Sequence, residues 1–192
     1  MASGRPIVPV FILDSEVDAL GAAPKWRLGL GLAKHKKALA ICGSGLVLRT
    51  GAPLACLQSL IEETGATSVY WSRLYDPSSI ARDQEVKETL KSQGIEARSF
   101  GGHLLFEPWS VETKTGGFYR VYSPMWRAVK DRDVAAPLAA PVRIAPPKNW
   151  PQSERIEDWS LDAAMARGAA IVRPYVRLGE AAAQDRLAEF TN

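Results

Sequence analysis

The sequence has few of the side chains that build metal sites. It contains two cysteines, Cys42 and Cys56, and two histidines, His35 and His103, and no short regular spacing links them. A structural zinc site takes four such ligands, usually in closely spaced pairs. We therefore expect no metal centre, and we expect both thiols to be reduced and packed in the fold.

Long apolar runs and long basic runs are also absent. No segment has the length and apolar character of a membrane span, and no charged stretch followed by an apolar one marks a secretory signal. The net charge is +3, and the Lys and Arg residues are spread along the chain rather than gathered into a nucleic-acid-binding arm. We expect a cytoplasmic protein. Its charge alone does not indicate DNA binding, and we expect no direct DNA binding by this chain alone.

Familiar catalytic and phosphate-binding motifs are missing too. The sequence has no G-x-G-x-x-G, no Walker loop and no G-x-S-x-G elbow. Its composition, 46% hydrophobic and 23% charged, is nevertheless ordinary for a globular domain. Fold and function therefore have to be read from the pattern of elements.

Short apolar runs alternate with helical patterns. Strands are predicted at residues 7–13, 46–48, 68–71 and 95–98, and helices are predicted from Pro24, from Pro53 and from residue 77 to about 93. His35 lies on the apolar stripe of the first helix, which predicts a packed core histidine. This alternation is typical of a doubly wound, mainly parallel Rossmann-like α/β sheet.

The pattern changes in the second half of the chain. Residues 135–151 are rich in Pro and Ala, which indicates a linker, and an amphipathic helix is predicted from Glu180. We therefore divide the chain into an α/β domain at 1–134 and a linker with the start of a helical region at 135–192.

Doubly wound sheets bind ligands beyond the carboxyl ends of their strands. This rule selects Asp14, Arg49, Gly51, Trp71, Arg73 and Asp76 as candidate cofactor-binding residues. Gly51 allows close backbone approach, Arg49 suits an anionic group, and Trp71 can stack on a planar ring. The alternative is that Trp71 is a core residue and Arg49 a solvated turn residue. No residue is predicted to be catalytic.

A dense group of aromatic residues follows the last strand. Its members are Phe106, Trp109, Phe118, Tyr119, Tyr122 and Trp126. A small core that covers the edge of the sheet is the expected role. Stacking on single-stranded nucleic acid is the alternative, which the scarcity of interleaved Lys and Arg disfavours.

Several of these segments together resemble the DNA photolyase/cryptochrome family, and the resemblance spans almost the whole chain. The matching segments are V-P-V-F-I-L-D at 8–14, W-R-L at 26–28, L-R-T-G at 48–51, Y-W-S-R-L-Y-D-P at 70–77, G-F-Y-R-V-Y-S-P-M-W at 117–126, and G-E-A-A-A at 179–183 with Leu187 and Phe190. No single one of them would suffice; their combination and order are specific.

The resemblance implies a function. The family uses blue light to drive electron transfer from a reduced flavin into a pyrimidine dimer in DNA, which makes the parent protein a DNA-repair lyase. Its N-terminal α/β domain often binds a light-harvesting antenna chromophore. The FAD and the DNA-binding surface belong to a C-terminal helical domain, whose pattern lies beyond Asn192. The resemblance thus implies an antenna-domain fragment that binds no FAD, is inactive alone, and has the missing FAD domain as a possible partner.

Three departures from the family pattern refine these expectations. Family members begin with a strand of the W-F-R-R-D-L-R type, which is central in the order 3-2-1-4-5; residues 1–5 stand in its place, so strands 7–13 and 68–71 are expected to lack their shared neighbour. Ser78 and Ser79 replace the Asn-Glu pair of folate-binding relatives. Asp76 matches one of two acidic residues of deazaflavin-binding relatives, and Leu74 replaces the other. A flavin or deazaflavin is therefore favoured over folate.

Two other interpretations stay open. One is that the chain is a generic nucleotide-binding α/β module. The other is that it is the non-functional product of a truncated or misassigned reading frame.

Overall fold

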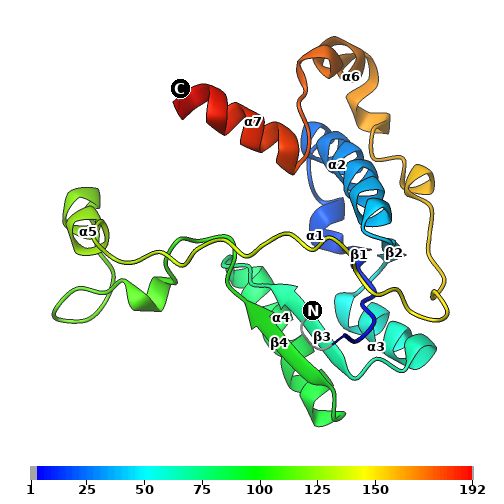
Figure 1. Cartoon of the computed structure of the whole chain (residues 1–192), viewed down its shortest axis with the longest axis horizontal. Coiled ribbons are helices and arrows are strands. Elements are labelled where there is room, and N and C mark those ends of the chain that lie inside the picture. The colour runs from blue at the N-terminus through cyan, green and yellow to red at the C-terminus, as the bar shows by residue number, and fades with distance from the viewer. Residues whose placement is uncertain (1–3, 192) are drawn as a thin grey trace. The chain divides into compact units, whose positions relative to one another are not determined.

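The computed structural model describes residues 4–191, which form two compact units (Figure 1). The first unit contains residues up to Gly65 together with those from Pro141 onward, and the second contains residues 66–140. The Pro/Ala-rich segment 135–151 therefore spans the point at which the chain returns to the first unit.

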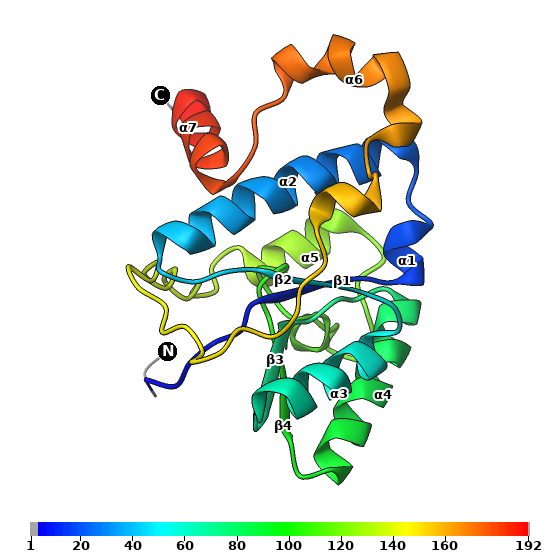
Figure 2. The same ribbon diagram turned by 90° about the vertical axis from the view of Figure 1, so that its right-hand side faces the viewer.

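The first unit is built on one parallel strand pair. β1 (Val10–Leu13) pairs with β2 (Val47–Thr50), with Val10 opposite Val47 and Leu13 opposite Thr50. The connection contains the short α1 (Ser15–Asp18) and the long α2 (Ala22–Ile41), because parallel strands need a crossover rather than a tight turn. α3 (Pro53–Thr64) follows β2. Figure 2 shows α2 lying alongside the two strands.

The linker and the chain that follows it complete the core of this unit. Leu13, Leu32 and Leu48 pack with Ile144 and Leu161, which come from the returning segment. Backbone hydrogen bonds fasten this segment at Ile7 N–H to Ala145 O (3.0 Å) and Ile144 N–H to Cys42 O (2.9 Å). The linker is thus part of the α/β core of the first unit and not only a spacer.

The C-terminal part of the first unit is made of short helical pieces. In chain order these are 3-10 helices at Ile156–Trp159 and Ala163–Met165, then α6 (Ala166–Val172), a 3-10 helix at Arg173–Tyr175, and α7 (Glu180–Thr191). α7 confirms the helix predicted from Glu180. Its apolar residues Leu187 and Phe190 are 62% and 87% exposed.

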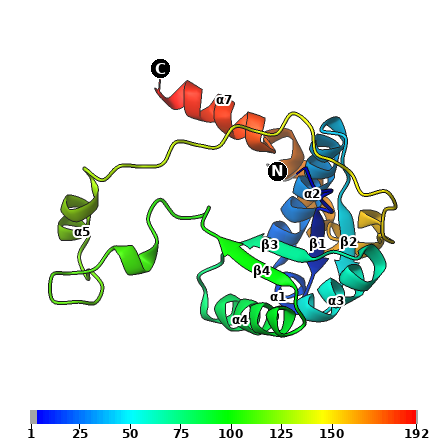
Figure 3. The same ribbon diagram turned by 60° about the horizontal axis from the view of Figure 1, so that its bottom comes forward.

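The second unit is a second parallel βαβ. β3 (Ser68–Ser72) and β4 (Glu96–Phe100) pair over five residues and are joined by α4 (Pro77–Ser92) (Figure 3). Val86, Leu90 and Ala97 are its buried apolar residues on α4 and β4. An irregular stretch with a 3-10 turn at Pro108–Ser110 leads to α5 (Tyr122–Val129).

The predicted α/β class and the order of strands and helices are confirmed. Within residues 4–191, β1 pairs with β2 alone and β3 with β4 alone, as expected for two strands without a shared neighbour. No helix in this range is long and apolar enough to cross a membrane.

His35 corrects the sequence-based interpretation. It is exposed rather than packed, together with its neighbours Lys34, Lys36 and Lys37. The buried residues of α2 are Trp26, Leu32 and Leu39, so this turn of the helix is solvated.

Candidate functional site

The candidate residues of the first unit gather where β1 and β2 end. Asp14 directly follows β1, is 7% exposed, and accepts a hydrogen bond from Val17 N–H (2.9 Å) as the N-cap of α1. This contact satisfies one of the free N–H groups at the start of the helix. Asp14 thus starts a helix at the strand end.

Arg49 is held by an ion pair within the same unit. Its terminal nitrogen donates to both carboxylate oxygens of Glu63 on α3, at 2.6 and 2.7 Å. The hydrogen bond from Arg49 is the main reason that the pKa of Glu63 is lowered. The Nε atom of Arg49 is buried without a partner among the described residues. Arg49 is therefore not the solvated turn residue of the alternative interpretation; it keeps one unsatisfied donor at the strand end.

Gly51 has a backbone conformation that requires glycine. Its φ is +132°, and its N–H donates to Leu13 O at 3.1 Å. A Cβ at this position would meet Cys56 Sγ at 3.6 Å, an ordinary contact, so the backbone angle and not crowding excludes other residues. Burial raises the pKa of the Cys56 thiol, which keeps it protonated.

Trp71 and Arg73 lie at the end of β3 in the second unit. Trp71 is partly buried, and its indole N–H donates to Asp83 on α4 (2.9 Å). Arg73 donates to Glu107 (2.8 Å) and to Ser99 O (3.2 Å).

Glu107 gathers a second donor and forms the centre of a small polar cluster. Tyr75 Oη–H donates to its other oxygen (2.9 Å), and the Arg73 guanidinium lies 5.0 Å from the Trp109 ring centroid. Burial, followed by the hydrogen bond to Glu107, raises the pKa of Tyr75. The cluster fixes the loop after β4 to the end of β3.

Asp76 is the N-cap of α4. Its carboxylate accepts from Ser79 N–H (2.9 Å) and from Ser78 Oγ–H (2.8 Å). These bonds, led by the one from the Ser79 backbone, lower the pKa of Asp76 to about 2. Ser78 and Ser79 thus belong to the start of this helix.

The structure therefore brings together Asp14, Arg49 and Gly51 at one strand end, and Trp71, Arg73 and Asp76 at another. Sequence reasoning missed the acidic residues that bind three of them, namely Glu63, Asp83 and Glu107, and it missed Glu154, which accepts from the neighbouring Thr50 N–H (2.8 Å). Glu63 and Asp83 lie on helices at positions that a solvated residue would also occupy. Glu107 and Glu154 lie in irregular chain, where no periodicity marks them.

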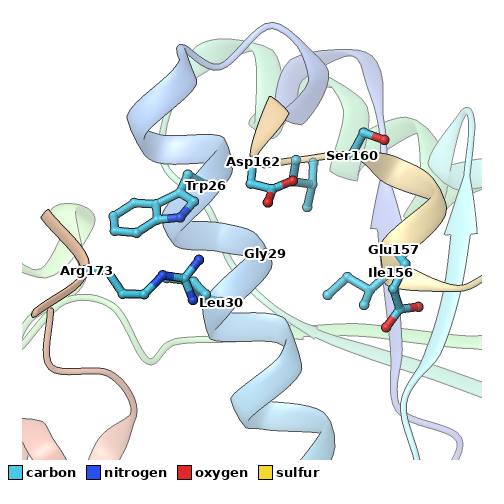
Figure 4. A pocket seen from close by; sticks show the side chains of 9 residues that line it. Trp26, Gly29, Leu30, Ile156, Glu157, Ser160, Asp162 and Arg173 are labelled. Atoms are coloured by element: carbon cyan, nitrogen blue, oxygen red, sulfur yellow. The ribbon is translucent and has the colours of Figure 1, made fainter. Parts of the chain in front are cut away.

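A small cavity of about 140 Å³ lies in the first unit between α2 and residues 156–162 (Figure 4). Trp26, Ser160, Asp162 and Arg173 are among the residues that line it. The Trp26 indole nitrogen has no hydrogen-bond partner among the described residues, and the atom itself is buried rather than exposed to the cavity. Within residues 4–191 no three His, Cys, Asp or Glu residues gather in a way that could hold a metal ion.

The aromatic group of the second unit differs from the predicted small core. Trp109, Phe118, Tyr122 and Trp126 are 60%, 75%, 67% and 46% exposed. Tyr122 and Trp126 stack with centroids 6.3 Å apart and planes at 6°. Only Phe106 and Tyr119 of the group are partly buried, so four of the six rings are exposed instead of packed into a small core.

Known proteins resemble this chain closely. The sequence profile of the DNA photolyase family matches residues 1–143. A deoxyribodipyrimidine photo-lyase of Agrobacterium fabrum is 40% identical over 188 residues, which cover 97% of this chain and 39% of the relative. Cryptochrome-2 of Arabidopsis thaliana is 34% identical over 73% of the chain and covers 24% of that protein.

Solved structures agree with these relatives. A bacterial class III photolyase from Agrobacterium tumefaciens superposes with a TM-score of 0.89 at 39% identity, over 98% of this chain and 39% of that protein. An archaeal photolyase from Sulfolobus tokodaii, solved with two FAD molecules, has the same fold at 18% identity and a TM-score of 0.69, over 84% of this chain and 36% of that one.

Parallel βαβ units with polar residues at their strand ends define a doubly wound α/β protein of the kind that binds ligands at such ends. The profile match and the relatives are more specific: the chain belongs to the DNA photolyase family. It spans 39% of the length of each of the two Agrobacterium photolyases.

Proposed function

We propose that this chain serves as the light-harvesting α/β part of a photolyase-type DNA repair protein. The observation that carries the proposal is the superposition of 98% of the chain on 39% of the Agrobacterium tumefaciens photolyase at a TM-score of 0.89. An antenna absorbs light and passes the excitation to a flavin. The residues of this chain would bind and orient that antenna and exclude water from it.

Each unit offers groups that suit a chromophore. In the first unit, the Arg49 guanidinium is fixed at the strand end by Glu63 and suits an anionic group. In the second unit, Trp71 offers an aromatic ring whose indole N–H is already satisfied by Asp83, and a flavin or deazaflavin supplies a flat ring to stack on it. The hydroxyls at 78 and 79 start a helix with Asp76, which leaves folate without the Asn-Glu pair of its binders.

An absorption spectrum of the purified chain tests this proposal. Mixed with FMN, a deazaflavin or a folate, the protein is expected to retain one of the first two through gel filtration, with a near-ultraviolet or blue absorption band. Retention of a colourless nucleotide alone would instead support a generic nucleotide-binding module.

We further propose that this chain alone does not repair pyrimidine dimers, and that an FAD-binding helical domain of the photolyase type is its partner. The four exposed rings support a partner, because exposed apolar side chains that lie together are commonly covered by another protein surface, and Tyr122 and Trp126 stack on each other. No direct DNA binding by the isolated chain is proposed.

The repair experiment is direct. The purified chain, dimer-containing DNA and reduced FAD are illuminated together, and the dimers that remain are counted. The rate is expected to equal that of reduced FAD without protein. Faster repair would contradict the proposal.

A further inference from the structure

The segment that returns after the linker closes the outer edge of β2. The Val47 N–H donates to Pro9 O, just before β1, and the Gly51 N–H donates to Leu13 O. The intervening Leu48 and Thr50 therefore direct their backbone groups to the opposite edge. There, Leu48 N–H donates to Ser153 Oγ (3.0 Å), Glu154 N–H donates to Leu48 O (3.0 Å), and Thr50 N–H donates to Glu154 Oε1 (2.8 Å). Residues 152–154, called the strap below, thus replace a neighbouring strand, with side-chain oxygens in place of backbone carbonyls.

One carboxylate carries most of this contact. Besides Thr50 N–H, Glu154 accepts from Thr50 Oγ1–H (2.6 Å) and from the Trp159 indole N–H (2.7 Å). The Trp159 ring packs on Phe11 of β1, with centroids 6.1 Å apart. Partial burial raises the pKa of Glu154, but the hydrogen bonds from Thr50 and Trp159 and the charge of Arg49 outweigh it and lower the pKa. Glu154 is therefore ionised and ties the end of β2 to the 3-10 helix that follows the strap.

The strap also touches the group that holds Arg49. Gln152 N–H donates to Glu63 Oε2 (3.2 Å), and the same carboxylate binds the Arg49 guanidinium. Two glutamates therefore hold the end of β2: Glu63 fixes Arg49, and Glu154 fixes Thr50. Gly51 comes next, with its positive φ.

We propose that Glu154 is a positioning residue for the candidate chromophore site. The strap covers β2, and the Glu154 carboxylate holds residues 49–51 in the shape that the site uses. The claim that this site binds a chromophore depends on the proposed function. The claim that the strap covers β2 depends only on the hydrogen bonds given above.

Amide hydrogen exchange, resolved by NMR at Leu48 and Thr50, tests the strap without any chromophore. Glu154→Ala is expected to accelerate exchange at both amides at least about tenfold, because charge-assisted bonds that protect the edge are lost. Glu154→Gln, whose single acceptor oxygen faces three donors, is expected to give a smaller increase. Trp159→Phe, which keeps the ring and removes its donor, should behave similarly.

Glu157→Gln is the matched control, since Glu157 is exposed and pairs only loosely with Arg155 (3.7 Å). If Glu154→Ala fails to fold, Glu154→Gln and Trp159→Phe decide the matter. Exchange at Leu48 and Thr50 as slow in these variants as in Glu157→Gln would overturn the strap.

The positioning role is tested on the chromophore that the wild-type chain retains. Glu154→Ala is expected to weaken its binding at least about tenfold, and Glu154→Gln less. Equal affinity in wild type and Glu154→Ala would overturn the positioning role. If the wild-type chain retains no flavin, deazaflavin or folate, the proposed function fails and the positioning role fails with it, while the exchange measurement still decides the strap.

Discussion

At the scale of single residues, the polar side chains at the strand ends are already occupied within the chain. Asp14 and Asp76 cap helices, Arg49 and Arg73 bind glutamates, and Trp71 binds Asp83. Side chains fixed in this way have lost their rotational freedom before any ligand arrives, which reduces the entropic cost of binding. The candidate residues of each unit are therefore pre-organised.

Trp71 is expected to supply a stacking surface. Trp71→Ala should weaken chromophore binding about tenfold or more, by analogy with the loss of a base–aromatic stack. Equilibrium dialysis or fluorescence titration measures this, with Trp71→Phe as the control that keeps a ring and loses the bond to Asp83. Unchanged affinity in Trp71→Ala and in Asp76→Ala would place the chromophore elsewhere.

Asp76 is expected to make stability depend on pH. Its pKa is lowered to about 2 from an ordinary value of 3.8, so its contribution is fully present above pH 3.8 and is lost as the pH falls toward 2. Thermal melts between pH 6 and about pH 2 should show that Asp76→Asn, which keeps a capping oxygen without the charge, loses less melting temperature on acidification than wild type. Parallel pH curves for the two proteins would contradict this assignment.

At the scale of elements, two glycines in helical context are expected to respond oppositely to substitution. Gly65 ends α3 with φ +66°, and Gly31 lies inside α2; a Cβ at either position has no atom within 4 Å. Gly65→Ala should destabilise the protein by about 1 kcal/mol or more, because the Cβ of alanine clashes with the neighbouring carbonyl oxygen in the left-handed conformation. Gly31→Ala should stabilise it by about 0.5–1 kcal/mol through helix propensity.

Urea unfolding of the two variants beside wild type measures both shifts. Gly65→Asn serves as a milder variant, since asparagine tolerates the left-handed region. A shift of the same sign in Gly65→Ala and Gly31→Ala would show that backbone conformation does not decide the outcome.

At the scale of the whole molecule, strand edges are expected to control association. Within residues 4–191, β3 pairs with one strand only, and the alternation of the ladder turns the backbone groups of Tyr70 and Ser72 to its other side. Unpaired edges are templates for pairing with another chain. We predict concentration-dependent self-association of the isolated chain.

Tyr70→Lys tests this prediction. Tyr70 is 48% exposed and donates to Glu96, with which a lysine can pair instead. A charge on this edge should reduce self-association in sedimentation velocity runs across a concentration series. Lys87→Arg on α4 is the control. A concentration-independent monomer for wild type would refute the prediction.

Local patterns in the sequence were sufficient for the order of strands and helices and for the family. Apolar runs such as 7–13 and 46–48 and the prolines at the starts of α3 and α4 act over a few residues, so they can be read without knowing what lies elsewhere. The helix stripe did not predict that His35 is exposed, because exposure depends on what packs against the helix.

The partners of the site residues were decided only by the tertiary structure. Glu154 lies 104 residues beyond Thr50 in the sequence, and Glu107 lies 34 residues beyond Arg73, yet each forms hydrogen bonds shorter than 3 Å to that residue. A lone glutamate in irregular chain has no periodicity to identify it, and its partner is set by where the chain returns. The local sequence thus determines the strands and helices of this protein, whereas the strap over β2 and the ion pairs at the strand ends arise from long-range packing.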